Sequence, residues 1–231
     1  MAAGLQAAFQ IETPLDLQQE WQALLARGGD PVELVTRPVG PQNIVEWALP
    51  ALLLITVAPS LAFYFQGFFT RLGEKTADAG VAAFAALFRK TSKVDHAWHP
   101  ASELRKPADQ RDPSQAKVSP VAAIRVPIKR DIGGGQSAAV AFEFILSDSL
   151  ADHDFGQVFA AADAVLRSSG TLLDEIVTDI SMIRSNPKRY LGVDRRDFVD
   201  DMLMTYFERR TSSLAGKYMH ALRTNRWIFV N

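Results

Sequence analysis

The residue types that could carry acid–base or metal chemistry gather in two short stretches. DHAWHP contains Asp95, His96 and His99, and ADHDFG contains Asp152, His153 and Asp154. Imidazole and carboxylate groups on one helix face could hold a metal ion or share a proton. DHAWHP lies in polar, proline-containing sequence that does not favour a helix. ADHDFG is typical of a helix start, where carboxylates cap free N–H groups. We therefore predict no catalytic residue, no metal site and no cofactor.

The glycine run RDIGGGQ, residues 130–136, raises the question of a phosphate-binding loop. Its DIGGG string is similar to the second phosphate loop of the actin-like and exopolyphosphatase-type ATPases, in which a buried apolar strand ends in aspartate. Here Lys129 and Arg130 precede Asp131, and the Gly-Thr-rich first phosphate loop of that family is missing. We predict a tight turn between two antiparallel strands, because glycine tolerates the positive φ that such turns need.

Composition narrows the class of protein. A chain of 231 residues with 48% hydrophobic residues can bury a core, and the absence of cysteine excludes disulfides and thiolate metal sites. The net charge of −1 offers no general attraction to nucleic acid. The basic residues of NPKRYLGVDRRDFVDD are interleaved with acidic ones, which also disfavours a polyanion. We expect no nucleic-acid partner, and the sequence favours a non-enzymatic protein.

Periodicity predicts an α+β fold with a small mixed or antiparallel sheet and packed helices. We expect strands near residues 7–12, 32–38, 121–129 and 137–146, where VAFEFIL alternates with period two. Residues 1–42 form a predicted β-α-β unit, whose helix has Leu17, Trp21, Leu24 and Leu25 on one face. Residues 43–90 are predicted to be a hydrophobic helical hairpin, and residues 91–119 a polar proline-containing linker.

Residues 120–231 are predicted to form a β-hairpin followed by a helical C-terminal region. Its three helical stretches are 149–169, 171–185 and 195–223, with Gly170 between the first two, a break near Ser212 in the third, and His220 in the third. NRWIFVN is predicted to be a last strand.

The segment 44–69 is the most distinctive part of the chain and is predicted to be helical almost throughout. No residue between Trp47 and Phe65 is charged, and its mean hydropathy is about 1.8, in the range of membrane spans. The predicted contact residues for a membrane or a protein partner are Trp47, Leu53, Ile55, Phe63, Tyr64, Phe65, Phe68 and Phe69. A helix buried on all sides in a protein core has the same pattern.

Two functions follow. The first is a membrane-associated protein with a cytoplasmic body, whose α+β body binds a partner and whose apolar helix anchors or inserts. The second is a soluble cytoplasmic α+β subunit of a larger assembly, with the apolar helix in a core or subunit interface. Both predict a protein partner or a homo-oligomer.

Overall fold

A computed structural model describes residues 5–10, 13–28, 32–37, 51–57, 65–73, 76–94, 97–98, 117–118, 121–193 and 195–230. The strands are β1 (Leu5–Gln10), β2 (Val32–Arg37), β3 (Leu53–Thr56), β4 (Ala97–Trp98), β5 (Lys117–Val118), β6 (Ala122–Gly133), β7 (Gln136–Leu146), β8 (Gly216–Ala221) and β9 (Arg226–Val230). The helices are α1 (Leu15–Ala26), α2 (Phe65–Leu72), α3 (Ala77–Thr91), α5 (Phe155–Ser185), α6 (Pro187–Leu191) and α7 (Arg196–Thr211), with two short 3₁₀ turns, Asp148–Leu150 and Leu222–Thr224.

The predicted α+β class is confirmed, but the sheet is not small. Seven strands form one mixed sheet in the order β2-β1-β3-β6-β7-β8-β9, and β4 pairs separately with β5. All four predicted strand regions belong to the seven-stranded sheet, and the predicted C-terminal strand is β9. The sheet gains β3 and β8 from segments that were predicted to be helical.

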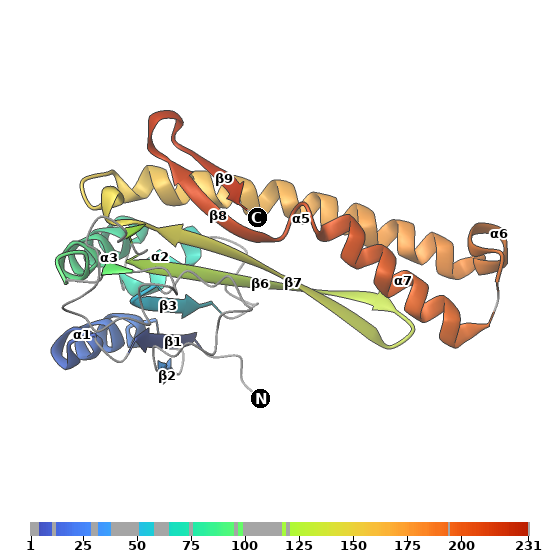
Figure 1. Cartoon of the computed structure of the whole chain (residues 1–231), viewed down its shortest axis with the longest axis horizontal. Coiled ribbons are helices and arrows are strands. Elements are labelled where there is room, and N and C mark those ends of the chain that lie inside the picture. Colours follow the sequence, from blue (N-terminus) through green and yellow to red (C-terminus); the bar gives the residue numbers. More distant parts are fainter. Residues whose placement is uncertain are drawn as a thin grey trace.

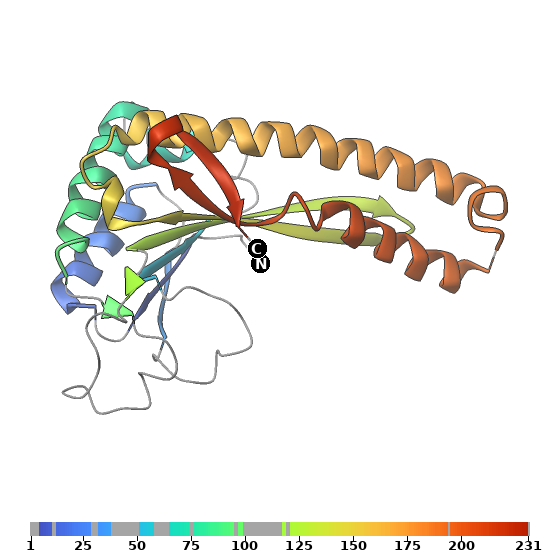
Figure 2. The same cartoon turned by 45° about the horizontal axis from the view of Figure 1, so that its top comes forward.

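One row of side chains shows where the core lies. Strand register places Leu34, Ala7, Ile55, Ile124, Phe144, Tyr218 and Phe229 side by side across all seven strands. Helices α1, α2, α3 and the first half of α5 pack over this face (Figure 2). Eight phenylalanine and tryptophan side chains fill the space between these helices and the sheet: Trp21, Phe65, Phe69, Phe84, Phe88, Phe144, Phe155 and Phe159.

The helix predicted for residues 44–69 is wrong at residues 53–56, which form strand β3. β3 lies between β1 and β6, so both of its edges are paired. A short apolar run fits a buried strand as well as a buried helix, and β-branched Ile55, Thr56 and Val57 favour the strand. Helices α2 and α3 do pack against each other. The long apolar arm expected for a helical hairpin is interrupted by β3.

The C-terminal region differs from prediction in two places. The two helices expected before residue 186 are one helix, α5, of 31 residues. Gly170 does not break it, because the buried stripe of Leu166, Ser169, Leu173 and Ile176 keeps its helical spacing through this point. The break predicted near Ser212 is confirmed, because α7 ends at Thr211. The residues beyond it were predicted to be helical and instead form β8, so His220 lies in a strand.

The seven-stranded sheet and the helices packed on it form the body of the molecule. From this body the long β6–β7 hairpin, the second half of α5, α6 and α7 extend to one side (Figure 1). β3 pairs only with residues 122–125 of β6, and β8 only with residues 142–145 of β7. The remainder of the hairpin continues alone and packs against α5 and α7. We call this extension the arm, and its far end, where α5, α6 and α7 meet, the arm tip.

Candidate interaction surfaces

Of the two stretches that suggested acid–base chemistry, the structure describes ADHDFG, and its residues are not assembled into a metal site. Asp95, His96 and His99 lie outside the described residues. Asp154 is the N-cap of α5, and its carboxylate accepts a hydrogen bond from the Gly156 N–H at 2.9 Å. Asp152 is exposed, and the buried Nδ1 of His153 has no hydrogen-bond partner. Within the described ranges, no group of three or more His, Asp or Glu side chains could hold a metal.

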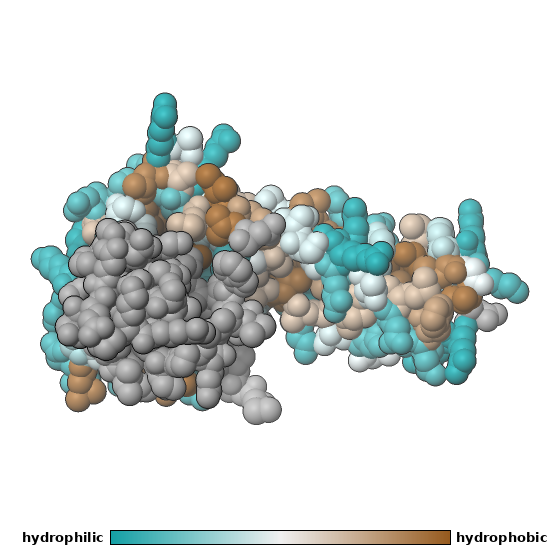
Figure 3. All heavy atoms as spheres, viewed as in Figure 1, coloured by the Kyte–Doolittle hydropathy of each residue, from teal (hydrophilic) through white to brown (hydrophobic). Residues whose placement is uncertain are grey.

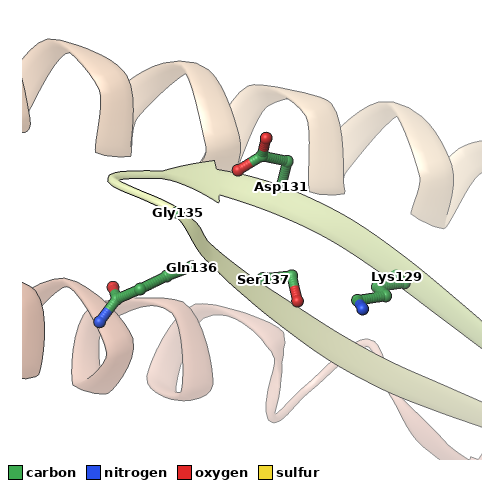
Figure 4. Close-up of a pocket in the computed structure, with 5 residues that line it drawn as sticks. All are labelled: Lys129, Asp131, Gly135, Gln136 and Ser137. Carbon is green, nitrogen blue, oxygen red and sulfur yellow. The ribbon is translucent and has the colours of Figure 1, made fainter.

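The glycine run is a hairpin turn, as predicted. Gly133, Gly134 and Gly135 all have positive φ and join β6 to β7. A shallow depression of about 410 Å³ beside the turn is lined by Lys129, Asp131, Gly135, Gln136 and Ser137. Figure 4 shows these residues spread over both strands, with Asp131 and Gln136 pointing to opposite sides. The side chains do not converge on one point.

The structure explains why glycine is needed at the centre of this turn. A Cβ atom at Gly134 would lie 2.4 Å from Nη1 of Arg184, near the end of α5. The Arg184 guanidinium forms an ion pair with Asp200 of α7, and its Nη2 donates to Oε1 of Gln136 at 3.4 Å. Arg184 therefore connects α5 and α7 to the hairpin turn. Its guanidinium occupies the space beside the glycines that a bound phosphate would need.

Five of the predicted contact residues lie inside the protein. Leu53 and Ile55 belong to the central strand β3, and Phe65, Phe68 and Phe69 belong to α2; all five side chains are buried. Trp47, Phe63 and Tyr64 lie outside the described residues. None of the described helices has the length and apolar character that a bilayer crossing requires. These five side chains could contact lipid or a partner only if they left the core. The predicted contact therefore stays a prediction.

The arm has a core of its own. Ile132 and Val140 of the hairpin, Leu173, Ile176 and Ile180 of α5, and Val199, Leu203 and Phe207 of α7 are all buried. Polar contacts hold the same elements together along the arm. Nε of Arg130 donates to Asp174 at 2.8 Å, and the Tyr206 hydroxyl donates to Asp179 at 2.9 Å. Continuous packing of this kind makes the arm a stable projection of the fold.

The arm tip exposes three large apolar side chains that sequence reasoning did not select. Met182 of α5 is 48% exposed, Tyr190 of α6 43% and Phe198 of α7 52%. Arg189 places its guanidinium carbon 5.6 Å from the centre of the Tyr190 ring. A depression beside Phe198 is lined by Val193, Arg195, Asp197, Phe198 and Asp201. The sequence does contain a sign that Met182 is exposed, because this residue does not share the helical spacing of the buried residues of α5. A single exposed apolar residue on a helix is common, however, and does not by itself identify a surface.

A further exposed apolar group lies on the β8–β9 hairpin. Met219 and Ile228 are neighbours across the two strands, 41% and 53% exposed. Figure 3 shows hydrophobic and strongly hydrophilic side chains together at the top of the body, where this hairpin lies. Among the residues that the structure describes, the candidate surfaces are thus the arm tip and this hairpin. No family model, no curated protein and no solved structure matches the chain.

Proposed function

We propose that the chain is a non-catalytic, protein-binding subunit of a larger assembly, and that the arm tip is the surface that holds its partner. The observation that carries the proposal is that the far end of the packed arm (Figure 1) exposes three large apolar side chains, Met182 of α5, Tyr190 of α6 and Phe198 of α7. Exposed apolar surface concentrated in one part of a molecule marks interaction sites more often than apolar residues scattered singly.

The composition of the arm tip supports a protein partner. Methionine, aromatic residues and arginine are enriched at protein–protein interfaces, and tyrosine and arginine are frequent among the residues that dominate binding energy. The tip combines Met182, Tyr190 and Phe198 with Arg189 and Arg195. Arg189 lies against the Tyr190 ring, an arrangement that orders both side chains before binding and so lowers the entropy cost of association.

The structure of the arm supports the same proposal. The Arg184–Asp200 ion pair lies within the part of the arm that carries all three exposed side chains, because Arg184 is near Met182 and Asp200 is near Phe198. A rigid surface binds more tightly than a mobile one with the same contacts. The arm extends away from the body, so a partner can surround its tip without contacting the sheet (Figure 2).

Site-specific photo-cross-linking in the cells of origin tests the proposal. A benzophenone side chain at position 198 is expected to give a discrete cross-linked product. The matched control places it at Leu15 of α1, which is 69% exposed on the body, and should give none. A product of twice the chain's mass identifies another copy of the chain as partner, and any other mass identifies a different protein. The absence of a product at 198, or the same products at both positions, contradicts the proposal.

Alanine substitution separates binding from folding. Tyr190→Ala with Phe198→Ala should reduce the cross-link from position 182 and shift the native complex in a cell extract to smaller size. The melting temperature should stay within about 2 °C of the wild type, since exposed substitutions rarely change stability by more than about 0.5 kcal/mol. Retention of the complex by a folded double variant would contradict the role of the tip.

Anchoring or insertion by the apolar segment, with a membrane-associated location, stays a separate proposal from the sequence. Its support is the uncharged stretch between Trp47 and Phe65.

A further inference from the structure

The β8–β9 hairpin presents two different faces. Tyr218 and Trp227 are buried, and the Trp227 indole N–H donates to the Val158 carbonyl of α5 at 3.0 Å. Met219 and Ile228 follow these residues in their strands, so their side chains point to the opposite face. The buried face fixes the hairpin to α5, and the outer face is left in contact with solvent.

The outer face continues an apolar row of the sheet. Strand register places Val35, Ala8, Leu54, Ala123, Ile145, Met219 and Ile228 side by side across the seven strands. Ala8, Ala123 and Ile145 are buried, whereas Met219 and Ile228 are exposed. Val35 and Leu54 are partly exposed, so the most exposed part of the row lies on the hairpin.

Charge on this hairpin has one sign. Residues 216–230 of the hairpin contain three arginine or lysine residues, Lys217, Arg223 and Arg226, and no aspartate or glutamate, in a chain whose net charge is −1. Lys217 and Arg226 lie on the same face as Met219 and Ile228, and exposed Arg223 lies at the turn. Lys217 has Glu143 as its neighbour on β7. Within the described ranges, Arg223 and Arg226 form no ion pair.

We define the hairpin face as Lys217, Met219, Leu222, Arg223, Arg226 and Ile228. We propose that the hairpin face binds the surface of an anionic lipid bilayer. Basic side chains are attracted to anionic headgroups, and aliphatic side chains beside them enter the boundary between headgroups and acyl chains. In Figure 1 the turn between β8 and β9 projects above α5.

The residue types favour lipid over an acidic protein at this face. Protein interfaces concentrate aromatic anchors in packed depressions, and the arm tip has both. The hairpin face has long cationic and aliphatic side chains, and its two aromatic residues, Tyr218 and Trp227, are turned inward. The two best-defined depressions of the described chain are lined by other residues. This inference is independent of the protein partner proposed for the arm tip.

Co-sedimentation of the purified full-length chain with vesicles tests the inference. Phosphatidylcholine vesicles with about 30 mol% phosphatidylserine should bind the protein at least about tenfold more strongly than phosphatidylcholine alone. Binding should fall when the salt concentration rises from about 0.1 M to about 0.5 M, because salt screens exposed charges.

Two hairpin variants locate the binding surface. Arg223→Glu with Arg226→Glu should lower the partition coefficient at least about tenfold, since each basic residue near an anionic bilayer contributes about a fivefold factor. Met219→Ser with Ile228→Ser should also weaken binding. The matched control, Arg27→Glu with Lys93→Glu, makes the same change in charge as the arginine variant, but at two exposed positions that belong to neither proposed surface, and should bind like the wild type. Circular dichroism and the melting temperature establish that each variant is folded.

Several outcomes would overturn the inference. Wild-type protein that stays in the supernatant with both vesicles excludes lipid binding. Equal binding to both vesicles, or wild-type binding by the folded hairpin variants, places any lipid contact elsewhere, for example in the apolar segment. Equal loss of binding in the Arg27→Glu, Lys93→Glu control shows that net charge, and not the hairpin face, determines binding. If the hairpin variant loses a cross-linked protein while vesicles are never bound, the hairpin face is a protein interface.

Discussion

The carboxylate of Asp163, in the middle of α5, accepts a hydrogen bond from the backbone N–H of Phe65, the first residue of α2, at an N···O distance of 2.7 Å. The two residues are 98 positions apart in the sequence, and Asp163 is buried. A buried carboxylate at a helix N-terminus is stabilised by the helix dipole and by the free N–H groups. This contact fixes the start of α2 against α5 inside the phenylalanine cluster.

Replacement of Asp163 by alanine should therefore reduce the free energy of unfolding by about 1–3 kcal/mol, because a buried N–H loses its acceptor. Chemical denaturation measures the change. Asp163→Asn keeps an acceptor oxygen and should cost less, and the exposed control Asp152→Ala should have little effect. Equal stability of Asp163→Ala and wild type would show that this bond does not hold α2.

Gly134→Val should destabilise the arm by about 1–3 kcal/mol, because valine is strained at positive φ and its side chain meets the Arg184 guanidinium. The matched control is Gly170→Ala in α5, where a Cβ has open space and alanine should stabilise the helix by about 0.5–1 kcal/mol. Thermal unfolding of the two variants should thus move in opposite directions. A folded Gly134→Val protein of wild-type stability would show that the turn tolerates a side chain.

Leu53→Arg or Ile55→Lys should prevent folding or cause aggregation, because each places an unpaired charge in the fully buried centre of the sheet. Solubility after expression and circular dichroism provide the measurement. Leu15→Arg, at an exposed position of α1, is the control and should remain soluble and folded. A folded Leu53→Arg protein that only moves from membrane to soluble fractions would support lipid contact by this segment instead.

Stability should fall as the pH drops below about 6.5, through His220. Burial lowers the pKa of His220 from its ordinary value of 6.5, a contribution from nearby His153 acts in the same direction, and the hydrogen bond to Asn225 opposes both. The unfolded chain therefore binds the proton more readily than the folded one, so this contribution is complete above pH 6.5 and is lost on acidification. Denaturation at several pH values should show a smaller loss for His220→Gln, and an identical loss would exclude His220 as its source.

Part of this fold could be predicted from local patterns in the sequence. Alternation identified β6 and β7, and three adjacent glycines identified their turn, because both signals depend on neighbouring residues. The helical spacing of Leu17, Trp21, Leu24 and Leu25 likewise identified α1, whose buried residues are these four. The position of Asp154 before a predicted helix start identified it as a cap, and its carboxylate caps α5.

Tertiary structure decided what the sequence left open or suggested wrongly. Residues 53–56 are apolar enough for a helix or a strand, and pairing with β1 and β6 made them a strand. Gly170 suggested a break that packing on the arm overrides, and the residues after Ser212 became β8 because β7 offers an edge for parallel pairing.

The exposure of Met182, Phe198, Met219 and Ile228 also depends on which neighbours cover them, and those neighbours come from distant parts of the chain. By itself the sequence determined the α+β class, the hairpin turn and the need to bury a large apolar surface. Packing between segments far apart decided which of those apolar residues form the core and which are left at the surface, because burial is a property of the assembled fold.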